Sequence, residues 1–221
     1  MTETIITVKG RFSAYFPAER AKLTVTVSFE GGDRDSVFEG TTVAADRVRD
    51  DITQLHQSPD GPITWWSSDS VRVWSERPWH SEGRRLAPVF HAAVSFTVKF
   101  SDFEALARFI ERVVAIDGVT LGEIEWTLTD AKITTVTAEV RSRAVKDAVA
   151  KASVFAQSIG LGTVRAIALA DPGMLGDQGS PAARVFEADM VRMASASSGD
   201  LQFKPEEIEV RAEVDARFIA S

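Results

Sequence analysis

Strict alternation of apolar and polar residues over long segments is the feature that most constrains how this chain folds. Residues 207–219 alternate almost without exception, with Ile208, Val210, Ala212, Val214, Ala216 and Phe218 on one face. Residues 21–30 and 86–100 alternate in the same way. A period of two with one polar face is typical of a strand that is buried on one side only. The three segments therefore predict antiparallel pairing, with one sheet face in the core and the other in water.

The remaining elements complete an α+β pattern. Short β-branched or apolar segments predict four more strands, at residues 4–10, 63–76, 122–129 and 164–169. Apolar stripes at steps of three and four predict three long helices, at residues 33–55, 101–117 and 134–159. Strand and helix do not alternate throughout, as they would in a parallel doubly wound fold. We therefore expect an α+β fold with antiparallel sheet or sheets of about seven strands and three long helices packed on one face.

The chain shows no internal boundary with the composition of a linker, so we expect a single domain over residues 1–221. Residues 171–202 differ from the rest because they are rich in glycine, alanine, serine and proline and have little periodicity. Such a segment is typical of a flexible excursion from the fold. We predict that it is the most mobile part of the chain and the first to be cut by proteases.

Charge and composition exclude several classes of function. The 221 residues carry a formal net charge of −7, with a pI near 5.1, whereas a nucleic-acid binder presents a net basic face. Cysteine is absent and the three histidines, His56, His80 and His91, are widely spaced, so we expect no metal site. No phosphate-binding loop or hydrolase motif occurs. We therefore expect no cofactor, no catalytic residue and no enzymatic activity.

The sequence also bears on location. The N-terminal segment has neither the basic start nor the apolar stretch of a signal peptide. No segment approaches the roughly 20 apolar residues that span a bilayer. We expect a cytoplasmic protein without a membrane span.

Four segments, taken in order along the chain, resemble the SIMPL-domain family, which includes periplasmic immunogenic antigens of Gram-negative bacteria. They are residues 5–10, a strand that ends in glycine; residues 21–27 and the helix that follows; the alanine-rich residues 141–162; and residues 203–210, a strand entered through proline. The resemblance implies an α+β fold and self-association as a homo-oligomer. It implies no catalytic residue, because the family has no established reaction. The chain lacks the signal peptide that many relatives carry, so their periplasmic location is not transferred. It also has Pro88, Val89 and Phe90 where relatives often show Gly-Tyr.

The loop at residues 77–85 is the most distinctive candidate surface. It concentrates Arg77, Trp79, His80, Arg84 and Arg85 on the tip of a predicted hairpin. Tryptophan and arginine are the usual anchors of protein–protein interfaces, so the loop is a candidate interaction surface. The simpler alternative is a solvated loop whose tryptophan folds back on its own hairpin. A catalytic role for His80 is the least favoured, since only Glu76 and Glu82 are near it in sequence.

Four other tryptophans, Trp65, Trp66, Trp74 and Trp126, are candidates for an aromatic cleft. Trp65 and Trp66 are adjacent on one predicted strand and must point to opposite faces. Burial under a helix or another subunit is the favoured interpretation, and an aromatic ligand wall is the alternative. Carboxylates on the last strand are expected to form a solvated face that Arg211 and Arg217 neutralise.

These observations predict a non-enzymatic, self-associating SIMPL-like protein that acts through protein–protein contacts. The alternative is a small-molecule or lipid binder with an aromatic-lined cleft. The first hypothesis predicts that the protein self-associates. The second predicts that a bound ligand shifts the tryptophan fluorescence.

Overall fold

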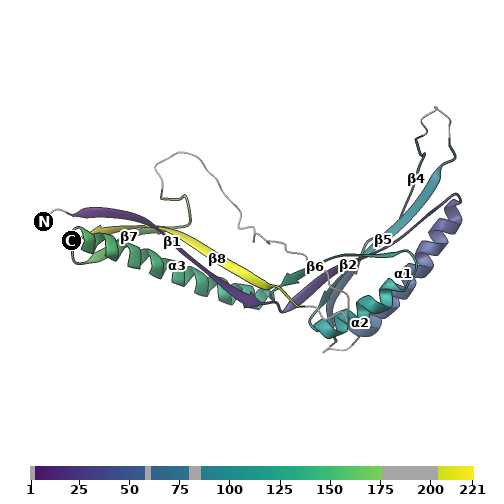
Figure 1. Ribbon diagram of the computed structural model, residues 1–221, viewed down its shortest axis with the longest axis horizontal. Coiled ribbons are helices and arrows are strands. Elements are labelled where there is room, and N and C mark those ends of the chain that lie inside the picture. The colour runs from purple at the N-terminus through teal and green to yellow at the C-terminus, as the bar shows by residue number, and fades with distance from the viewer. Residues whose placement is uncertain (1–2, 58–60, 80–85, 176–203) are drawn as a thin grey trace. The chain divides into compact units, whose positions relative to one another are not determined.

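The computed structural model describes residues 3–57, 61–79, 86–175 and 204–221 (Figure 1). These residues form two compact units, each with its own sheet and its own hydrophobic core. The single domain predicted over residues 1–221 therefore contains two cores. No linker composition marks the division, because the chain passes between the units in short steps from Pro17 to Arg20 and from Thr127 to Asp130.

The first unit, here called the three-stranded unit, contains β1 (Thr4–Pro17), α3 (Asp130–Ser158), β7 (Val164–Ala170) and β8 (Glu207–Ala220). The strands pair antiparallel in the order β1-β8-β7. The pairing of β1 with β8 runs from Thr4 to Pro17 without a register shift. The helix α3 packs against the sheet through the alanines at positions 144, 148, 152 and 156, all of them fully buried.

Gly10 explains how closely α3 approaches the sheet. A Cβ atom at this position would lie 2.1 Å from the carbonyl oxygen of Ala144 and 2.8 Å from the Cβ of Ala148. Only glycine on β1, facing alanines on α3, leaves room for the two backbones at this distance. The small side chains are therefore matched across the contact.

The second unit, here called the five-stranded unit, contains β2 (Arg20–Gly31), α1 (Arg34–His56), β3 (Ile63–Ser68), β4 (Arg72–Glu76), β5 (Val89–Phe100), α2 (Phe103–Val114) and β6 (Val119–Thr127). The sheet order is β3-β5-β2-β6, and β4 pairs with the other end of β5. Both helices supply residues to the core on one face of this sheet, together with alternate residues of β2 and β5. The other face of the sheet carries the polar residues of the same strands.

Side-chain caps fix where the helices begin. Asp33 accepts hydrogen bonds from the backbone and the hydroxyl of Ser36 at the start of α1. Asp102 accepts from two backbone N–H groups at the start of α2, and Thr129 caps α3. The hydrogen bonds from Ser36 lower the pKa of Asp33, so this cap is ionised at neutral pH.

The predicted fold class is confirmed, with differences in detail. The structure has three helices and eight strands among the described residues, where about seven strands were expected. The extra strand arises because residues 63–76 do not form one strand but two, separated at residues 69–71. No described helix has the combination of length and apolar character that a membrane crossing needs. Most of the predicted excursion at 171–202 lies outside the described residues; only 171–175 are described.

Candidate functional site

The strand β4 and the N-terminal half of β5 form an arm whose base is held by stacked rings. Trp74 lies opposite His91 in the strand register, and their rings stack with centroids 5.2 Å apart at 13°. The guanidinium of Arg72 lies 5.6 Å from the centroid of the Trp74 ring. The indole on the polar face of the sheet therefore contacts both an imidazole and a cation.

His91 lies between two carboxylates from the neighbouring strands. Its Nδ1 is 3.4 Å from Glu30 Oε2 on β2, and its Nε2 is 3.5 Å from Glu76 Oε1 on β4. The Nε2 atom is buried and has no hydrogen bond among the described residues. The ring of His91 on β5 therefore lies close to a carboxylate from each of the two strands that flank it, β2 and β4.

The tip of the arm carries the described part of the predicted interaction surface. Arg77 is exposed and Trp79 is 85% exposed, the most exposed large apolar side chain among the described residues. The other predicted members, His80, Arg84 and Arg85, lie outside the described residues. The simpler alternative had this tryptophan fold back on its own hairpin, but at this exposure Trp79 is not packed against the described part of the hairpin.

The four tryptophans proposed for an aromatic cleft do not share one cavity. Trp66 and Trp126 pack against the core of the five-stranded unit, and Trp126 meets Phe103 edge to face with ring centroids 4.9 Å apart. Trp65 and Trp74 are exposed on the opposite face of the sheet, and the ammonium of Lys99 lies 5.2 Å from the centroid of the Trp65 ring. The proposed cleft is therefore not formed, because the sheet separates its members into two pairs.

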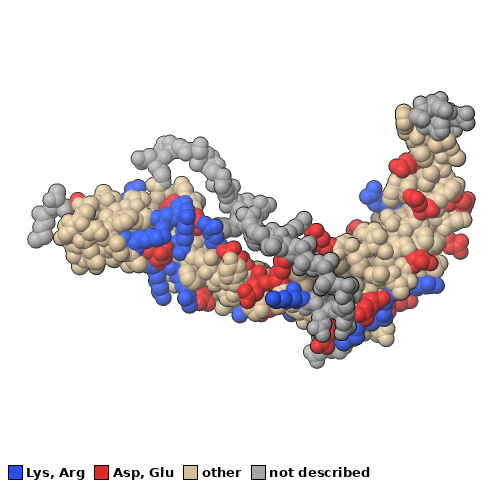
Figure 2. Space-filling model, viewed as in Figure 1, with Lys and Arg blue, Asp and Glu red and all other residues tan. Residues whose placement is uncertain are grey.

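A ladder of charged side chains covers the outer face of the three-stranded unit, and Figure 2 shows basic side chains gathered there. At its centre Glu213 accepts from Arg211 at 2.5 Å and pairs with Arg11 Nε at 3.1 Å, while Lys9 Nζ is 3.5 Å away. Burial by itself would raise the pKa of Glu213, but the hydrogen bond from Arg211 and the nearby cations outweigh it and lower this pKa. Of the two arginines expected to neutralise the carboxylates, Arg211 does so, with Arg11 and Lys9 as partners from β1. The other, Arg217, donates to the carbonyl of Leu175 instead.

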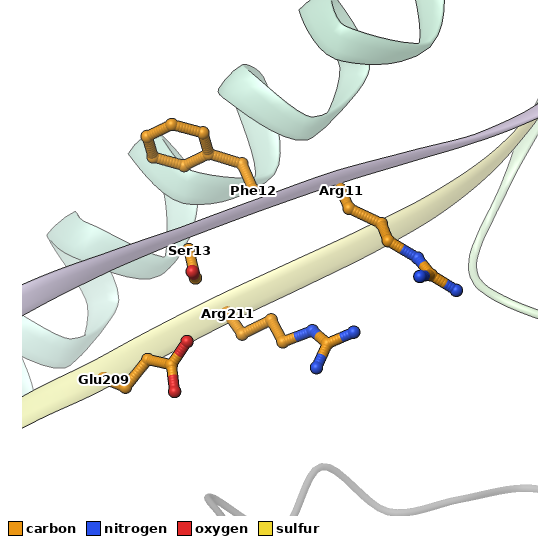
Figure 3. A pocket seen from close by; sticks show the side chains of 5 residues that line it. All are labelled: Arg11, Phe12, Ser13, Glu209 and Arg211. Carbon is orange, nitrogen blue, oxygen red and sulfur yellow. The ribbon is translucent and has the colours of Figure 1, made fainter.

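A shallow pocket of about 360 Å³ lies beside this ladder. Figure 3 shows Arg11 and Arg211 pointing the same way from neighbouring strands, whereas Phe12 points to the side of α3. Glu209 and Ser13 complete the lining. Because both guanidiniums already contact Glu213 and Glu209 adds a second negative charge, the pocket has little net charge with which to attract an anion.

A pair of charged residues on α3, which the sequence reasoning missed, reaches the free edge of β1. Asp147 Oδ2 accepts the backbone N–H of Arg11 at 2.8 Å, and Lys151 Nζ donates to the carbonyl of Lys9 at 3.1 Å. The two side chains also pair with each other at 2.6 Å. The hydrogen bonds from Lys151 and from the Arg11 N–H lower the pKa of Asp147. Their spacing of four on a predicted helix was visible, but nothing in the sequence tied them to β1.

A second groove, of about 380 Å³, lies in the five-stranded unit between α1 and the residues that follow α2. Its apolar lining is Phe29, Val43, Ala44 and Ile116, and its rim is polar. None of the tryptophans lines it. Within the described ranges, no group of three or more histidine, aspartate or glutamate side chains is placed to hold a metal ion.

Comparison with known proteins identifies one family. The model of the SIMPL family, described as a protein of unknown function (DUF541), matches residues 6–218. No curated protein matches the chain.

Solved structures resemble the chain only distantly. An uncharacterised conserved protein from Listeria innocua is 12% identical over 96% of this chain and 92% of its own, with a TM-score of 0.25. A putative amidohydrolase/peptidase from Burkholderia cenocepacia is 11% identical over 63% of this chain, with a TM-score of 0.25. An amidase of the hydantoinase/carbamoylase family from Burkholderia multivorans is 16% identical over 62% of this chain, with a TM-score of 0.23. The chain spans about a third of the length of the two Burkholderia proteins, at 34% and 33%.

Proposed function

This chain belongs to the SIMPL family of proteins of unknown function, and we propose that it is a non-enzymatic protein that acts through self-association and protein–protein contacts. The observation that carries the proposal is the arm of the five-stranded unit. Its base is fixed by the stack of Trp74 on His91, and its tip presents Trp79 at 85% exposure. Tryptophan is among the residues that contribute most to binding at protein–protein interfaces, so an exposed tryptophan at the end of an ordered hairpin favours a contact surface there.

The shifted carboxyl groups favour a structural role over a catalytic one. Asp33, Asp147 and Glu213 all have a lowered pKa, because each accepts hydrogen bonds from named partners in a cap, a strand edge or a charge ladder. A general acid that works at neutral pH needs the opposite shift. These three groups therefore serve as fixed negative charges.

Self-association is tested by measuring the molar mass of the full chain by light scattering over a hundredfold range of concentration. The mass is expected to rise above that of one chain as the concentration increases. A constant mass of 24.1 kDa at every concentration would refute the proposed self-association.

The arm is tested by the access of iodide to tryptophan in the same samples. Trp79 dominates the quenching of a dilute sample because it is the most exposed of the described tryptophans, and contact at the arm is expected to protect it. The W79A variant should lose this concentration-dependent protection, whereas W65A, a matched change at an exposed tryptophan outside the arm, should keep it. Unchanged iodide access in an assembled wild-type sample would remove the arm as a contact surface.

A second candidate function, binding of a small apolar molecule or lipid, is favoured by the groove beneath α1 rather than by the tryptophans. Binding there would be seen as saturable fluorescence enhancement of an anilinonaphthalene sulfonate probe. V43D, which places a charge in the lining, should abolish the enhancement, and V154E, a charge placed on an exposed valine of the other unit, should not.

A further inference from the structure

The free edge of β1 is divided into a blocked part and an open part. The backbone N–H of Arg11 and the carbonyl of Lys9 are hydrogen-bonded by α3 side chains instead of by a strand. Because the N–H and C=O of one strand residue point to the same side, the odd-numbered residues of β1 direct their backbone groups to this edge. Among the described residues, no helix or loop group bonds to the edge-facing backbone of Ile5 or Thr7.

One row of α3 side chains runs beside this edge. Asp147, Lys151 and Phe155 are spaced by four, and each precedes an alanine of the stripe that packs on the sheet. These side chains therefore lie side by side with the buried stripe, always on the same flank of α3. The row they form runs along β1 toward the N-terminal end of that strand. The two charged members cap residues 9–11, and the next member, Phe155, is 53% exposed. Ile159, the residue that follows the end of α3, is also exposed.

The other edge strands of the two sheets are protected differently. The strands β3, β6 and β7 each have a register shift in their pairing, and β4 has only five residues. Irregular or short edges resist the addition of another strand. Among the described strands, β1 is the long edge strand without a register shift, so its open part is the place where another strand can add.

The sequence of the open part is complementary to itself. Residues 4–8, Thr-Ile-Ile-Thr-Val, are uncharged and have high strand propensity, and they lie between Glu3 and Lys9. An antiparallel pairing of two copies centred on Ile6 places Ile5 opposite Thr7 of the other copy and Glu3 opposite its Lys9. Opposite charges then meet at both ends of the paired segment.

We propose that two copies of this chain join through the β1 edge at residues 4–8, forming one continuous sheet across a two-fold axis with α3 of both copies on the same side. This inference rests on the proposed self-association and adds to it a contact surface in the three-stranded unit, separate from the one proposed for the arm. The pairing closes on itself, so it produces a dimer and not a fibre. The caps at residues 9–11 limit the added strand to the uncharged segment.

The first test compares two proline variants by sedimentation velocity. T7P removes an edge-facing N–H in the open part, and because this N–H has no hydrogen-bond partner among the described residues, the fold is expected to tolerate the change. S13P is the matched control, since Ser13 has the same orientation on the same strand but lies beyond the caps. T7P should raise the concentration of half-association at least tenfold, and S13P should leave it within twofold. F155E should likewise raise the concentration of half-association at least tenfold. Its control V154E, on another side of α3, should leave that concentration within twofold.

The second test reads the register by cross-linking, which is free of background because the chain has no cysteine. Ile5 and Thr7 of opposite copies would have Cα atoms about 5.5 Å apart, within the range of a disulfide, whereas like positions would be more than about 7 Å apart. A mixture of I5C and T7C proteins should therefore form a disulfide-linked dimer with oxidised glutathione, and neither variant alone should do so.

The outcomes separate this interface from the proposed function. Assembly that persists in T7P, with no cross-link in the mixture, would overturn the β1 interface and leave self-association standing. A wild-type chain that stays monomeric would overturn both. Cross-linking of I5C alone would show a different register and contradict the charge pairing argued above.

Discussion

Replacing Gly10 with alanine tests whether the close approach of α3 to β1 holds the three-stranded unit together. The new Cβ would lie 2.1 Å from a backbone carbonyl oxygen and 2.8 Å from the Cβ of Ala148. Unstrained contacts between such atoms need roughly 3.5 Å, so α3 must move away by ~1 Å or more. The obstacle is backbone on both sides, so no side-chain rotation can relieve it.

The expected cost follows from what the movement disrupts. Overpacking a well-packed contact costs typically ~1–3 kcal/mol. Lifting α3 also stretches the hydrogen bonds that Asp147 and Lys151 make to β1, each worth about 1 kcal/mol. The lower entropy of alanine in the unfolded chain offsets about 0.4–1 kcal/mol. We expect a net loss of about 3 kcal/mol, or a fall of about 2 M in the urea midpoint of this unit.

The tryptophans make the assay specific to one unit. All five lie in the five-stranded unit, at positions 65, 66, 74, 79 and 126. In G10A the far-UV circular dichroism should therefore show an early transition that tryptophan fluorescence does not follow. G32A is the control, because a Cβ at Gly32 meets nothing within 4 Å. A G10A midpoint within about 0.3 M of wild type, or an equal fall in G32A, would refute the packing argument.

Three further predictions address the edge, the arm and the cap. The pKa of Asp147 is lower in the folded chain than in the unfolded chain, where it is about 4. The carboxylate therefore adds stability at a pH above about 4, and this stability is lost as the pH falls through the pKa of the folded chain. D147N should remove this contribution and flatten the acid side of a plot of stability against pH. W74A should lower the free energy of unfolding by about 1 kcal/mol through loss of the ring stack, as read by circular dichroism, while W79A should leave it unchanged. D33A should lower the midpoint of the same denaturation curve, because α1 loses its cap.

Local pattern was sufficient to predict most of the elements. Alternation located β2, β5 and β8 within a few residues, because each has one face in a core and the other in water. The break between β3 and β4 was missed, since both strands pair with β5 and the interruption at residues 69–71 has no glycine or proline to mark it. The division into two cores was missed for a related reason. Only two residues separate β1 from β2 at one crossing of the boundary, and two separate β6 from α3 at the other. Periodicity does not say which sheet a strand joins.

The candidate sites were predicted less well, because they depend on contacts between distant residues. Trp79 stood out from composition alone, and its exposure agrees with a surface role. The four tryptophans of the proposed cleft are divided by the sheet, which depends on strand register and not on their presence in the sequence. His91 meets Glu30 and Glu76 only because β2 and β4 flank β5. The roles of Gly10 and Asp147 likewise depend on the packing of α3 against β1, which the sequence does not reveal.

At the β1 edge, one helix both permits and limits the addition of another strand. Where α3 presents Asp147 and Lys151, it supplies the hydrogen bonds that another strand would otherwise make, and it does so with charges that a further strand would have to desolvate. One turn later the row becomes apolar at Phe155, which is exposed, so covering this side chain with another strand is favourable. The length of strand that can add is therefore set by the point at which the row changes from charged to apolar. A sequence that moved this point toward Tyr15 would expose a longer regular edge and would favour open-ended aggregation over a closed pair.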